Sequence, residues 1–482
     1  MNFVRSNYLI ALVLLTTLVK GVAWAYVVPP FQAPDEQVHY AEIQHYAEPA
    51  GYAPQSYDFP LGKTSLFDIK TQNLSPELKD YLERADFEKT RFDRETKTDF
   101  INHLPFRDDE PAEHLSRFVE KYPAWLTNYP PLYYQAGAVM ENAFSGWGVA
   151  EKSFFLRLFS VFLTAIFVLA AYLLFRELNL ARSTAALLAG TVSFQPMLTF
   201  IASSINVDAF LFTSFGLFLW GSVRVIRKNP EWIGLTALIA GTTLSALAKP
   251  SGYFAIFTLP ALAVILVLRN YEKIVEWDKN KKISRGFLAG TMLSGAIAVL
   301  YFFYQAEKAR YFAGSQALLL LPAYILHQLE YPVFLIHSLY YWGNFAWLSM
   351  TINPFFIHVI WVVLALAFIG ILKYFWQKPK EKTKFYQTVF LVFMVGGFFL
   401  MIHAVNFQQV NPNNVADETN AIAIQGRYFF PVMAAKFYLI YLGLTVLFKK
   451  IRPRTVAWLL FLSMVTLNLT GLIFYIIPRY YF

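Results

Sequence analysis

Cysteine is absent from this 482-residue chain, and charged residues are scarce. Without cysteine, the protein has no disulfides, no thiolate metal ligands and no thiol nucleophile. Only 15% of its residues are charged, against about a quarter in a soluble domain. The sequence also contains no Walker-type phosphate loop, no HExxH motif and no serine nucleophile elbow. These absences exclude a soluble disulfide scaffold and several common hydrolase and nucleotide-binding designs.

Apolar residues dominate instead, at 56% of the chain, and they occur in repeated runs. Runs of about twenty apolar residues separated by short charged loops are typical of transmembrane helices. The sequence therefore predicts an all-α polytopic membrane protein with about eleven transmembrane helices. The predicted spans are residues 8–28, 153–176, 184–203, 208–226, 231–249, 251–269, 286–304, 355–376, 385–405, 431–448 and 456–477.

These spans divide the chain into five parts. Residues 1–28 form the first span, which we interpret as retained because it ends in Val-Val-Pro-Pro and not in a signal-peptidase site. A long extracytoplasmic loop with juxtamembrane helices follows, and then six more spans. An outer interfacial segment precedes the last four spans, which include another outer loop. The last four parts are residues 29–152, 153–304, 305–354 and 355–482, with the second outer loop at 406–430.

The basic residues predict the orientation of the chain. Positively charged loops stay in the cytoplasm, and a cytoplasmic N-terminus places every strongly basic loop on that side. The net charge of +9 is thereby explained without a nucleic-acid partner. The loops alternate between the two sides in this way only if two apolar stretches, 130–147 and 315–345, lie at the outer interface and do not cross the membrane. The basic inner loops are those at 176–182, 224–228, 279–285, 378–384 and 449–454.

The first outer loop is acidic, with 19 acidic and 11 basic residues between positions 31 and 123. It opens with the motif Pro-Pro-Phe-Gln-Ala-Pro-Asp-Glu-Gln-Val-His at 29–39. The prolines end the first span, and Asp35 can cap a new helix. On that helix Asp35, Glu36 and His39 are spaced to share one face, as a general base with an orienting or metal-binding neighbour would require. The alternative is a helix cap with a local Glu–His contact.

Further polar residues are predicted at the outer ends of other spans, where ionisable groups are costly and suggest function. A lysine and an arginine at the lipid–water boundary are suited to a lipid phosphate. Taken singly, each residue is also explained as a capping or snorkelling group, and the aromatic ones as part of an interfacial belt. These candidates for substrate binding are Asn206, Asp208, Lys249, Tyr129, Gln425 and Arg427.

Together these motifs resemble those of the GT-C membrane glycosyltransferases. More narrowly, the chain resembles the bacterial family of predicted membrane proteins called domain of unknown function 2142. The motifs that carry this resemblance are Asn-Tyr-Pro-Pro-Leu-Tyr-Tyr at 128–134, Ser-Ile-Asn-Val-Asp at 204–208, Lys-Pro-Ser-Gly-Tyr at 249–253, the aromatic stretch at 342–347 and Gln-Gly-Arg-Tyr-Phe-Phe-Pro at 425–431, with the 29–39 motif before them.

The resemblance implies a lipid-linked-sugar-dependent glycosyltransferase of the bacterial inner membrane, acting in cell-envelope assembly. The donor would be a sugar on polyprenyl phosphate or pyrophosphate, and the acceptor a glycan, lipid or protein at the outer face. Asp35 would deprotonate the acceptor, and Glu36 and His39 would orient it, hold an acceptor or bind a metal. Arg427 and Lys249 would hold the carrier phosphate. A Mg²⁺ or Mn²⁺ requirement stays open, with Asp35 and Asp208 as the ligands if a metal is used.

Two other functions fit a protein of this class. A transporter or flippase for lipid-linked saccharides places charged groups through the membrane depth or uses broken helices in related halves. The sequence contains no internal repeat, and its ionisable residues gather at one predicted face. A structural assembly subunit would instead scatter these residues around its perimeter. Clustering of these residues in one cavity would separate an enzyme from such a subunit; they are Asp35, Glu36, His39, Asp208, Lys249 and Arg427.

Overall fold

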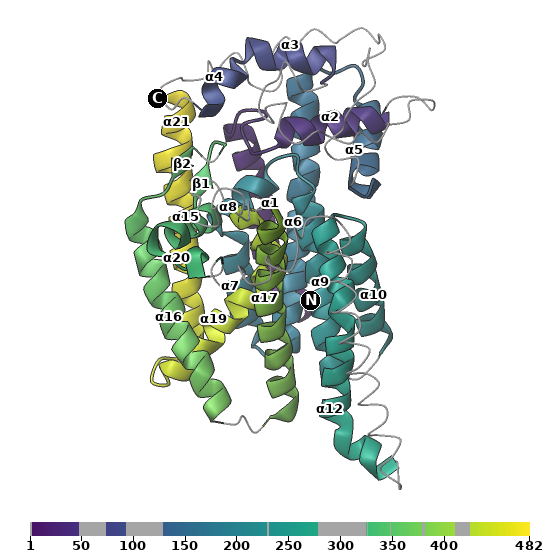
Figure 1. Ribbon diagram of the computed structural model, residues 1–482, viewed down its shortest axis with the longest axis vertical. Helices are drawn as coiled ribbons and strands as arrows, with labels where there is room; N and C mark the ends of the chain where they lie inside the picture. Colours follow the sequence, from purple (N-terminus) through teal and green to yellow (C-terminus); the bar gives the residue numbers. More distant parts are fainter. Residues whose placement is uncertain are drawn as a thin grey trace.

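The computed structural model describes residues 2–47, 74–92, 129–228, 231–277, 324, 326–347, 349–377, 381–409 and 425–482. Its described elements are helices, apart from a two-residue antiparallel pairing of β1 (Asn344–Phe345) with β2 (Met350–Thr351). Most of the helices run along the long axis of the molecule (Figure 1). The prediction of an all-α polytopic membrane protein is therefore confirmed.

Eight helices in the described residues are long and apolar enough to cross a membrane. Most of their backbone polar groups are paired within the helix, as the hydrocarbon core requires. They include α1 (Asn2–Val27), α6 (Val149–Glu177), α9 (Asp208–Lys228), α12 (Leu259–Trp277, preceded by η2, Pro250–Tyr253, and α11, Phe254–Phe257), α16 (Pro354–Trp376), α17 (Lys382–Gln409), η3 (Gly426–Val432) with α19 (Met433–Leu447), and α20 (Pro453–Gly471) with η4 (Leu472–Ile476) and α21 (Ile477–Tyr481).

Three of the predicted spans need separate comment. The span predicted at 184–203 consists of two helices, α7 (Arg182–Ser193) and α8 (Pro196–Ala202), which meet at an angle of 66°. The span predicted at 231–249 is a shorter helix, α10 (Trp232–Ala246). The span predicted at 286–304 lies outside the described residues. The exact span count stays a prediction.

Lys20 of α1 lies at the break between α7 and α8. Its Nζ donates to the Ser193 carbonyl oxygen at 2.6 Å and to Thr199 Oγ1 at 2.6 Å. Pro196 cannot donate to the turn before it, so the helix breaks there and leaves carbonyl groups free. Asn468 of α20 also donates to Thr199 Oγ1, at 2.8 Å. The amine of Lys20 therefore faces the bundle interior and stabilises the broken helix.

Small residues let two pairs of helices approach closely. A Cβ atom added to Gly443 of α19 would lie 2.0 Å from the Ala367 carbonyl oxygen of α16. A Cβ atom added to Gly241 of α10 would lie 2.2 Å from the Phe218 backbone nitrogen of α9. Tight packing of this kind holds helices together in a membrane, where burial of apolar surface provides no driving force.

Four helices form a cap at one end of the bundle (Figure 1). The cap consists of α2 (Glu36–Ala47), α3 (Pro76–Arg84), α4 (Phe87–Phe92) and α5 (Leu132–Ala143). A buried lysine of α6, Lys152, joins it to the bundle, with Nζ 3.3 Å from Glu141 Oε1 and 3.6 Å from Glu77 Oε1. The predicted interfacial stretch 130–147 contains α5, which packs on α2, and the stretch 315–345 contains α15 (Tyr331–Trp342).

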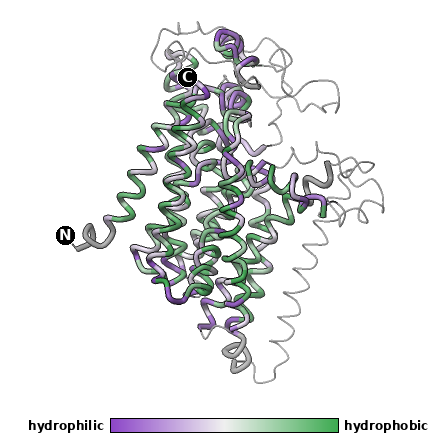
Figure 2. Tube along the Cα trace, turned by 90° about the vertical axis from the view of Figure 1, so that its left-hand side faces the viewer, coloured by the Kyte–Doolittle hydropathy of each residue, from purple (hydrophilic) through white to green (hydrophobic). Residues whose placement is uncertain are grey.

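Hydrophobic residues cover the middle of the bundle, and hydrophilic ones gather toward its two ends (Figure 2). Exposed apolar side chains such as Leu12, Val19 and Phe368 point outward from α1 and α16. The end opposite the cap is formed by the last residues of α6, α9, α16 and α19 and by the first residues of α7, α17 and α20. We call it the basic end, because these described arginines and lysines lie there: Arg176, Arg182, Arg224, Arg227, Lys228, Lys373, Lys382, Lys384, Lys449, Lys450, Arg452 and Arg454. A belt of outward apolar residues between two polar ends is the surface expected of a membrane-embedded bundle.

Candidate functional site

The chain enters the cap through a short segment that Arg157 of α6 holds in place. Its guanidinium donates to three backbone carbonyls around the end of α1, those of Ala25 (2.9 Å), Val28 (2.5 Å) and Pro29 (2.8 Å). The same group forms an ion pair with Glu36, in which Nε lies 2.7 Å from Oε1 and Nη2 lies 2.7 Å from Oε2. Pro29 and Pro30 end α1 at this point.

Glu36 therefore does not join the face that carries Asp35 and His39, as the spacing had suggested. Its side chain is fully buried, and its Oε1 also accepts a hydrogen bond from the Ile205 backbone nitrogen at 2.9 Å. Arg157 engages both carboxylate oxygens of Glu36, and the Ile205 nitrogen engages one of them. Glu36 therefore joins the start of α2 to α6 and to the segment before α9. These contacts give Glu36 a structural role, and its catalytic role stays a prediction.

The backbone around Asp35 is strained. Phe31 and Asp35 both have a φ of 65°, in the left-handed region that non-glycine residues seldom adopt. Trp347 Nε1 donates to the Phe31 carbonyl oxygen at 2.8 Å, and Arg427 Nη1 donates to the Pro34 carbonyl oxygen at 3.1 Å. Each strained residue costs about 1–3 kcal/mol and persists only where its surroundings impose it. In this backbone conformation the Asp35 side chain is directed at Arg427. Asp35 therefore pairs with Arg427 and does not cap the new helix, contrary to what the sequence had predicted.

Four charged side chains of alternating sign form a network, which we call the charge quartet: Asp35, Arg427, Asp208 and Lys249. Asp35 Oδ2 accepts a short hydrogen bond from Arg427 Nη2. Arg427 Nε lies 3.5 Å from Asp208 Oδ2, and Lys249 Nζ lies 2.9 Å from Asp208 Oδ1. The four residues come from the start of α2, from η3, from the first residue of α9 and from the residue before η2. All four were predicted from the sequence, and the structure brings them together.

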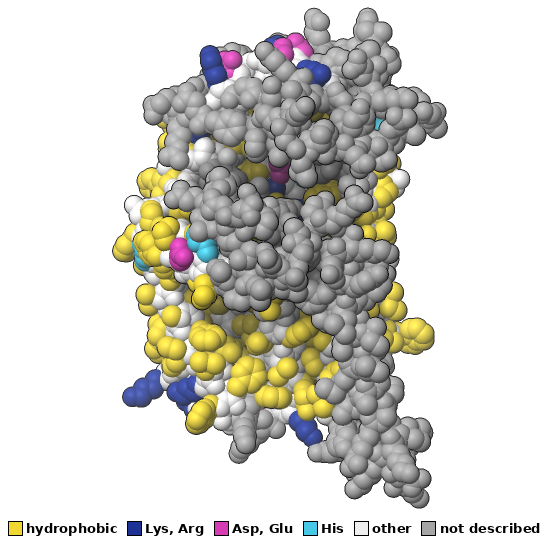
Figure 3. Space-filling model, viewed as in Figure 1, with side chains coloured by type: hydrophobic (Ala, Val, Ile, Leu, Met, Phe, Trp, Pro, Cys, Tyr) yellow, Lys and Arg dark blue, Asp and Glu magenta, His cyan; other side chains and the backbone are white. Residues whose placement is uncertain are grey.

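The quartet has one open side. The side chains of Arg427 and Asp208 are each only 4% exposed, whereas that of Asp35 is 43% exposed. In the space-filling view an acidic and a basic side chain are visible together in a hollow beneath the cap (Figure 3). A molecule reaching this site therefore meets Asp35 first.

Aromatic rings flank Lys249. Its Nζ lies 5.0 Å from the ring centroid of Tyr428 and 5.5 Å from that of Tyr129, and the guanidinium of Arg427 lies 5.7 Å from the Tyr428 ring. Cation–π contacts at these distances hold a cation while leaving its hydrogen-bond donors free for a ligand. Tyr129 thus lies beside the quartet as predicted, and Tyr428 is a neighbour that sequence reasoning missed.

Two predicted polar residues, Asn206 and Gln425, lie near the charge quartet in the sequence but are not members of it. Asn206 is buried, and its Oδ1 accepts from the Asp208 backbone nitrogen at 2.9 Å, which fixes the start of α9. Gln425 precedes η3, and its buried Oε1 contacts no donor among the described residues. Asn206 therefore positions Asp208, while Gln425 lies next in sequence to the glycine before Arg427.

His39 lies on the same face of α2 as Asp35. Its Nδ1 is 3.0 Å from the Tyr134 hydroxyl oxygen, and the two rings stack with centroids 6.0 Å apart. Burial lowers the pKa of His39 to about 3, so the imidazole is neutral at pH 7. It can hold a substrate hydroxyl, or orient one toward Asp35, without carrying a charge.

Glu42 extends this face by one more turn and was not among the predicted residues. Its side chain is 5% exposed, and its Oε1 has no hydrogen-bond partner in the described part of the chain. Burial raises its pKa to about 7. The signal that could have revealed it is the i, i+4, i+7 spacing of Asp35, His39 and Glu42, which places all three on one side of a helix.

The charges of the quartet determine the protonation of Asp35 and Lys249. Enclosure would raise the pKa of Asp35, but the charge and hydrogen bond of Arg427 lower it below its usual value. Burial would lower the pKa of Lys249, but the Asp208 carboxylate raises it above its usual value. Asp35 is therefore ionised and Lys249 is charged at neutral pH.

The two predicted metal ligands do not fit a divalent cation. Asp35 and Asp208 already share Arg427 as their counter-ion, and Lys249 occupies the second oxygen of Asp208. Within the described ranges, no three histidine, aspartate or glutamate side chains gather in a way that could hold a metal ion. We therefore derive no step through a metal.

No curated protein sequence matches the chain. A crystal structure of ArnT from Cupriavidus metallidurans bound to undecaprenyl phosphate is similar to it at 14% sequence identity and a TM-score of 0.32. That match covers 89% of this chain and 77% of the other. A family model described as a predicted membrane protein, DUF2142, matches residues 18–435, so the chain belongs to this family, as its motifs had suggested.

Proposed function

We propose that the protein transfers a sugar from a polyprenyl-phosphate or polyprenyl-pyrophosphate donor to an acceptor hydroxyl, with the charge quartet as its active site. The observation that carries this proposal is the convergence of Asp35, Asp208, Lys249 and Arg427 from four separate segments into one network. Buried charges are costly to assemble, and at a bundle end they suggest function. Residues that only anchored a structural subunit would have been dispersed.

The cap end, in this proposal, faces the outside of the cytoplasmic membrane. The arginines and lysines at the ends of α6, α9, α16 and α19 lie at the basic end, and loops rich in these residues stay in the cytoplasm. The N-terminus is then cytoplasmic and the quartet extracytoplasmic. A lipid-linked sugar with its head group at the outer surface would reach the hollow beside Asp35.

Asp35 acts as the general base in the proposed reaction. Its carboxylate accepts the proton of the acceptor hydroxyl while the acceptor oxygen forms a bond to the anomeric carbon. The bond from that carbon to the carrier phosphate oxygen breaks, and its electron pair stays on the phosphate. Arg427 and Lys249 stabilise the charge that grows there, Arg427 through a fork of donors and Lys249 as a point charge.

Donor binding also explains how Asp35 becomes a sufficient base. Before binding, Arg427 holds the pKa of Asp35 low, which makes the carboxylate a weak base. A phosphate that attracts Arg427 and Lys249 weakens their hold on the two carboxylates, and the pKa of Asp35 then rises. Asp35 thus becomes a stronger base only when the donor is bound.

The quartet also favours transfer over transport. A flippase would place its charged groups along the membrane depth, whereas these four lie together beneath the cap. The break between α7 and α8 resembles a transporter feature, but the lysine amine of α1 already satisfies its free carbonyl. Glycolipid and envelope-glycan profiles of cells with and without the protein test the proposal. Loss of one glycan in cells without the protein supports sugar transfer. Accumulation of a fully assembled lipid-linked saccharide in those cells would indicate a transport defect and contradict the proposal.

A further inference from the structure

Lys436 is a cation with an unusual setting. It lies in the first turn of α19, and its Nζ is 3.7 Å from the ring centroid of Tyr341 and 5.2 Å from that of Trp342. Among the residues that the structure describes, it contacts these two rings, and no carboxylate pairs with it and no acceptor receives a hydrogen bond from it. The two cations of the charge quartet, in contrast, are both paired. An ammonium group in a membrane-embedded bundle needs an anion or water, so Lys436 is ready for a ligand.

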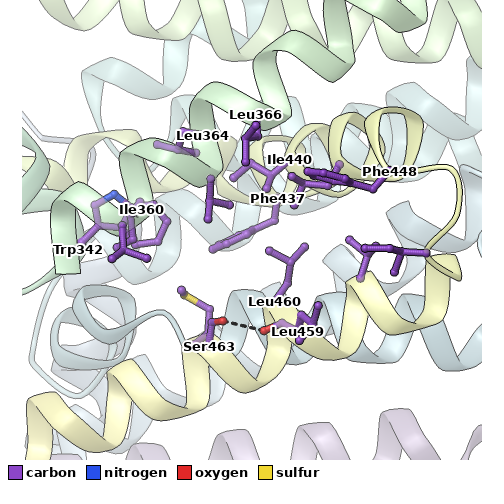
Figure 4. Close-up of a pocket in the computed structure, with 16 residues that line it drawn as sticks. Trp342, Ile360, Leu364, Leu366, Phe437, Ile440, Phe448, Leu459, Leu460 and Ser463 are labelled. Carbon is purple, nitrogen blue, oxygen red and sulfur yellow. Dashed lines mark hydrogen bonds between the residues drawn. The ribbon is translucent and has the colours of Figure 1, made fainter. Parts of the chain in front are cut away.

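An apolar groove begins beside this lysine. It lies between α16, α19 and α20 and has a volume of about 300 Å³. Trp342 and Ile360 lie toward one end, and Phe448 toward the other (Figure 4). Of the described residues that line it, Ser463 carries the hydroxyl, which donates to the Leu459 carbonyl oxygen at 2.8 Å and is therefore satisfied within its own helix. The described lining is otherwise apolar, apart from the indole of Trp342 toward one end.

The lysine and the groove belong to one surface. Ile440 and Leu444 line the groove one and two turns after Lys436 on the same side of α19. Trp342 contributes to both, since it lines the groove and lies beside the ammonium group. A cation at the end of an apolar groove complements a molecule with an anionic head and a hydrocarbon chain.

We propose that Lys436, Tyr341 and Trp342 bind the phosphate head of an anionic phospholipid, whose acyl chain lies in the groove between α16, α19 and α20. The surrounding bilayer supplies such lipids, and the outward apolar surface of α16 places the groove next to them. This site is separate from the charge quartet, and the proposal stands whether or not the protein transfers sugars.

Lipid binding here would also support the active-site segment. Tyr341 packs on Phe430, with ring centroids 5.8 Å apart, and Gly426 fits so closely that an added Cβ would lie 2.3 Å from the Tyr341 Cα atom. Phe430 and Gly426 lie in η3 together with Arg427. A lipid that fixes Tyr341 and Trp342 therefore stabilises the helix that carries Arg427.

Native mass spectrometry of the full-length protein tests the proposal, by titration with phosphatidylglycerol or phosphatidylcholine. We expect one tightly bound phosphatidylglycerol, with its apparent affinity reduced about five- to tenfold in Lys436→Gln and retained in Lys436→Arg. Leu460→Trp, which fills the groove, should also reduce it. The matched control is Lys450→Gln, which removes an exposed lysine at the basic end. Phosphatidylcholine should bind more weakly and be unaffected by the lysine variants.

Three results would overturn the proposal. One is equal phosphatidylglycerol affinity in the parent and in Lys436→Gln. Another is an unchanged affinity in Leu460→Trp, which stays decisive if Lys436→Gln does not fold. The last is displacement of phosphatidylglycerol by polyprenyl phosphate at equal concentration, which would assign the groove to the carrier lipid instead.

Discussion

Replacing Glu36 by glutamine leaves the guanidinium of Arg157 buried without its counter-charge. Arg157 is 1% exposed and Glu36 is 0% exposed, so water does not compensate the loss. Removal of one partner from a buried ion pair costs about 3–5 kcal/mol. Glutamine can still accept from the Ile205 nitrogen, and Arg157 keeps its three carbonyl partners. We therefore expect the lower end of this range, about 3 kcal/mol of unfolding free energy.

The assay is equilibrium unfolding in detergent micelles, followed by intrinsic fluorescence, for Glu36→Gln, Arg157→Met and the double variant. The matched control is Glu83→Gln, an exposed glutamate of α3, which should change stability by less than about 0.5 kcal/mol. The double variant should be less destabilised than the sum of the single variants, because neither charge is then left alone. Parental stability of Glu36→Gln combined with lost sugar transfer would refute the structural role and return Glu36 to the catalytic group.

Three further predictions concern Glu42, Arg427 and Gly443. Because burial raises the pKa of Glu42 from 4.5 to about 7, its contribution to stability is complete below pH 4.5 and is lost as pH rises through 7. Glu42→Gln should flatten the pH dependence of the melting temperature over that interval, and an unaltered slope would contradict the assignment. Arg427→Ala should raise the apparent donor KM about ten- to a hundredfold, whereas an unchanged KM would remove Arg427 from the phosphate site. Gly443→Leu should separate α16 from α19 and lower the melting temperature, and parental melting would argue against their close contact.

The spans were predictable because a bilayer imposes one simple requirement, a run of apolar residues long enough to cross it. The bend after Ser193 was not anticipated, although Pro196 marks it, because hydropathy averages over such a break. The count of eleven depends partly on residues 286–304, which lie outside the described ranges.

The charge quartet was predictable for a related reason. A charged residue at the end of a span is costly, so Asp208, Lys249 and Arg427 were conspicuous individually, and their convergence followed from a shared depth. Glu36 was misplaced because the left-handed φ of Asp35 directs the two adjacent carboxylates to different partners, Arg427 and Arg157. Helical spacing rules assume helical backbone angles, so they do not predict this left-handed conformation.

Glu42 and Tyr134 were missed for a different reason. The spacing of Glu42 from His39 places it on the same face of α2, but a glutamate on a charged outer loop is normally solvated, and its burial comes from the packing of α5 on α2. Contacts between residues 95 positions apart, such as that of His39 with Tyr134, leave no local pattern in the sequence.

The most direct test of the proposed function is the rate of sugar transfer by Asp35→Asn in proteoliposomes supplied with a radiolabelled polyprenyl-linked sugar extract. Removal of a general base typically lowers the rate about 10²- to 10⁴-fold. We predict a loss of that size with the melting temperature retained, and parental transfer in Asp80→Asn, a control at an exposed aspartate of α3. Transfer by Asp35→Asn at the parental rate would contradict the assignment of Asp35 as the base and, with it, the proposed active site.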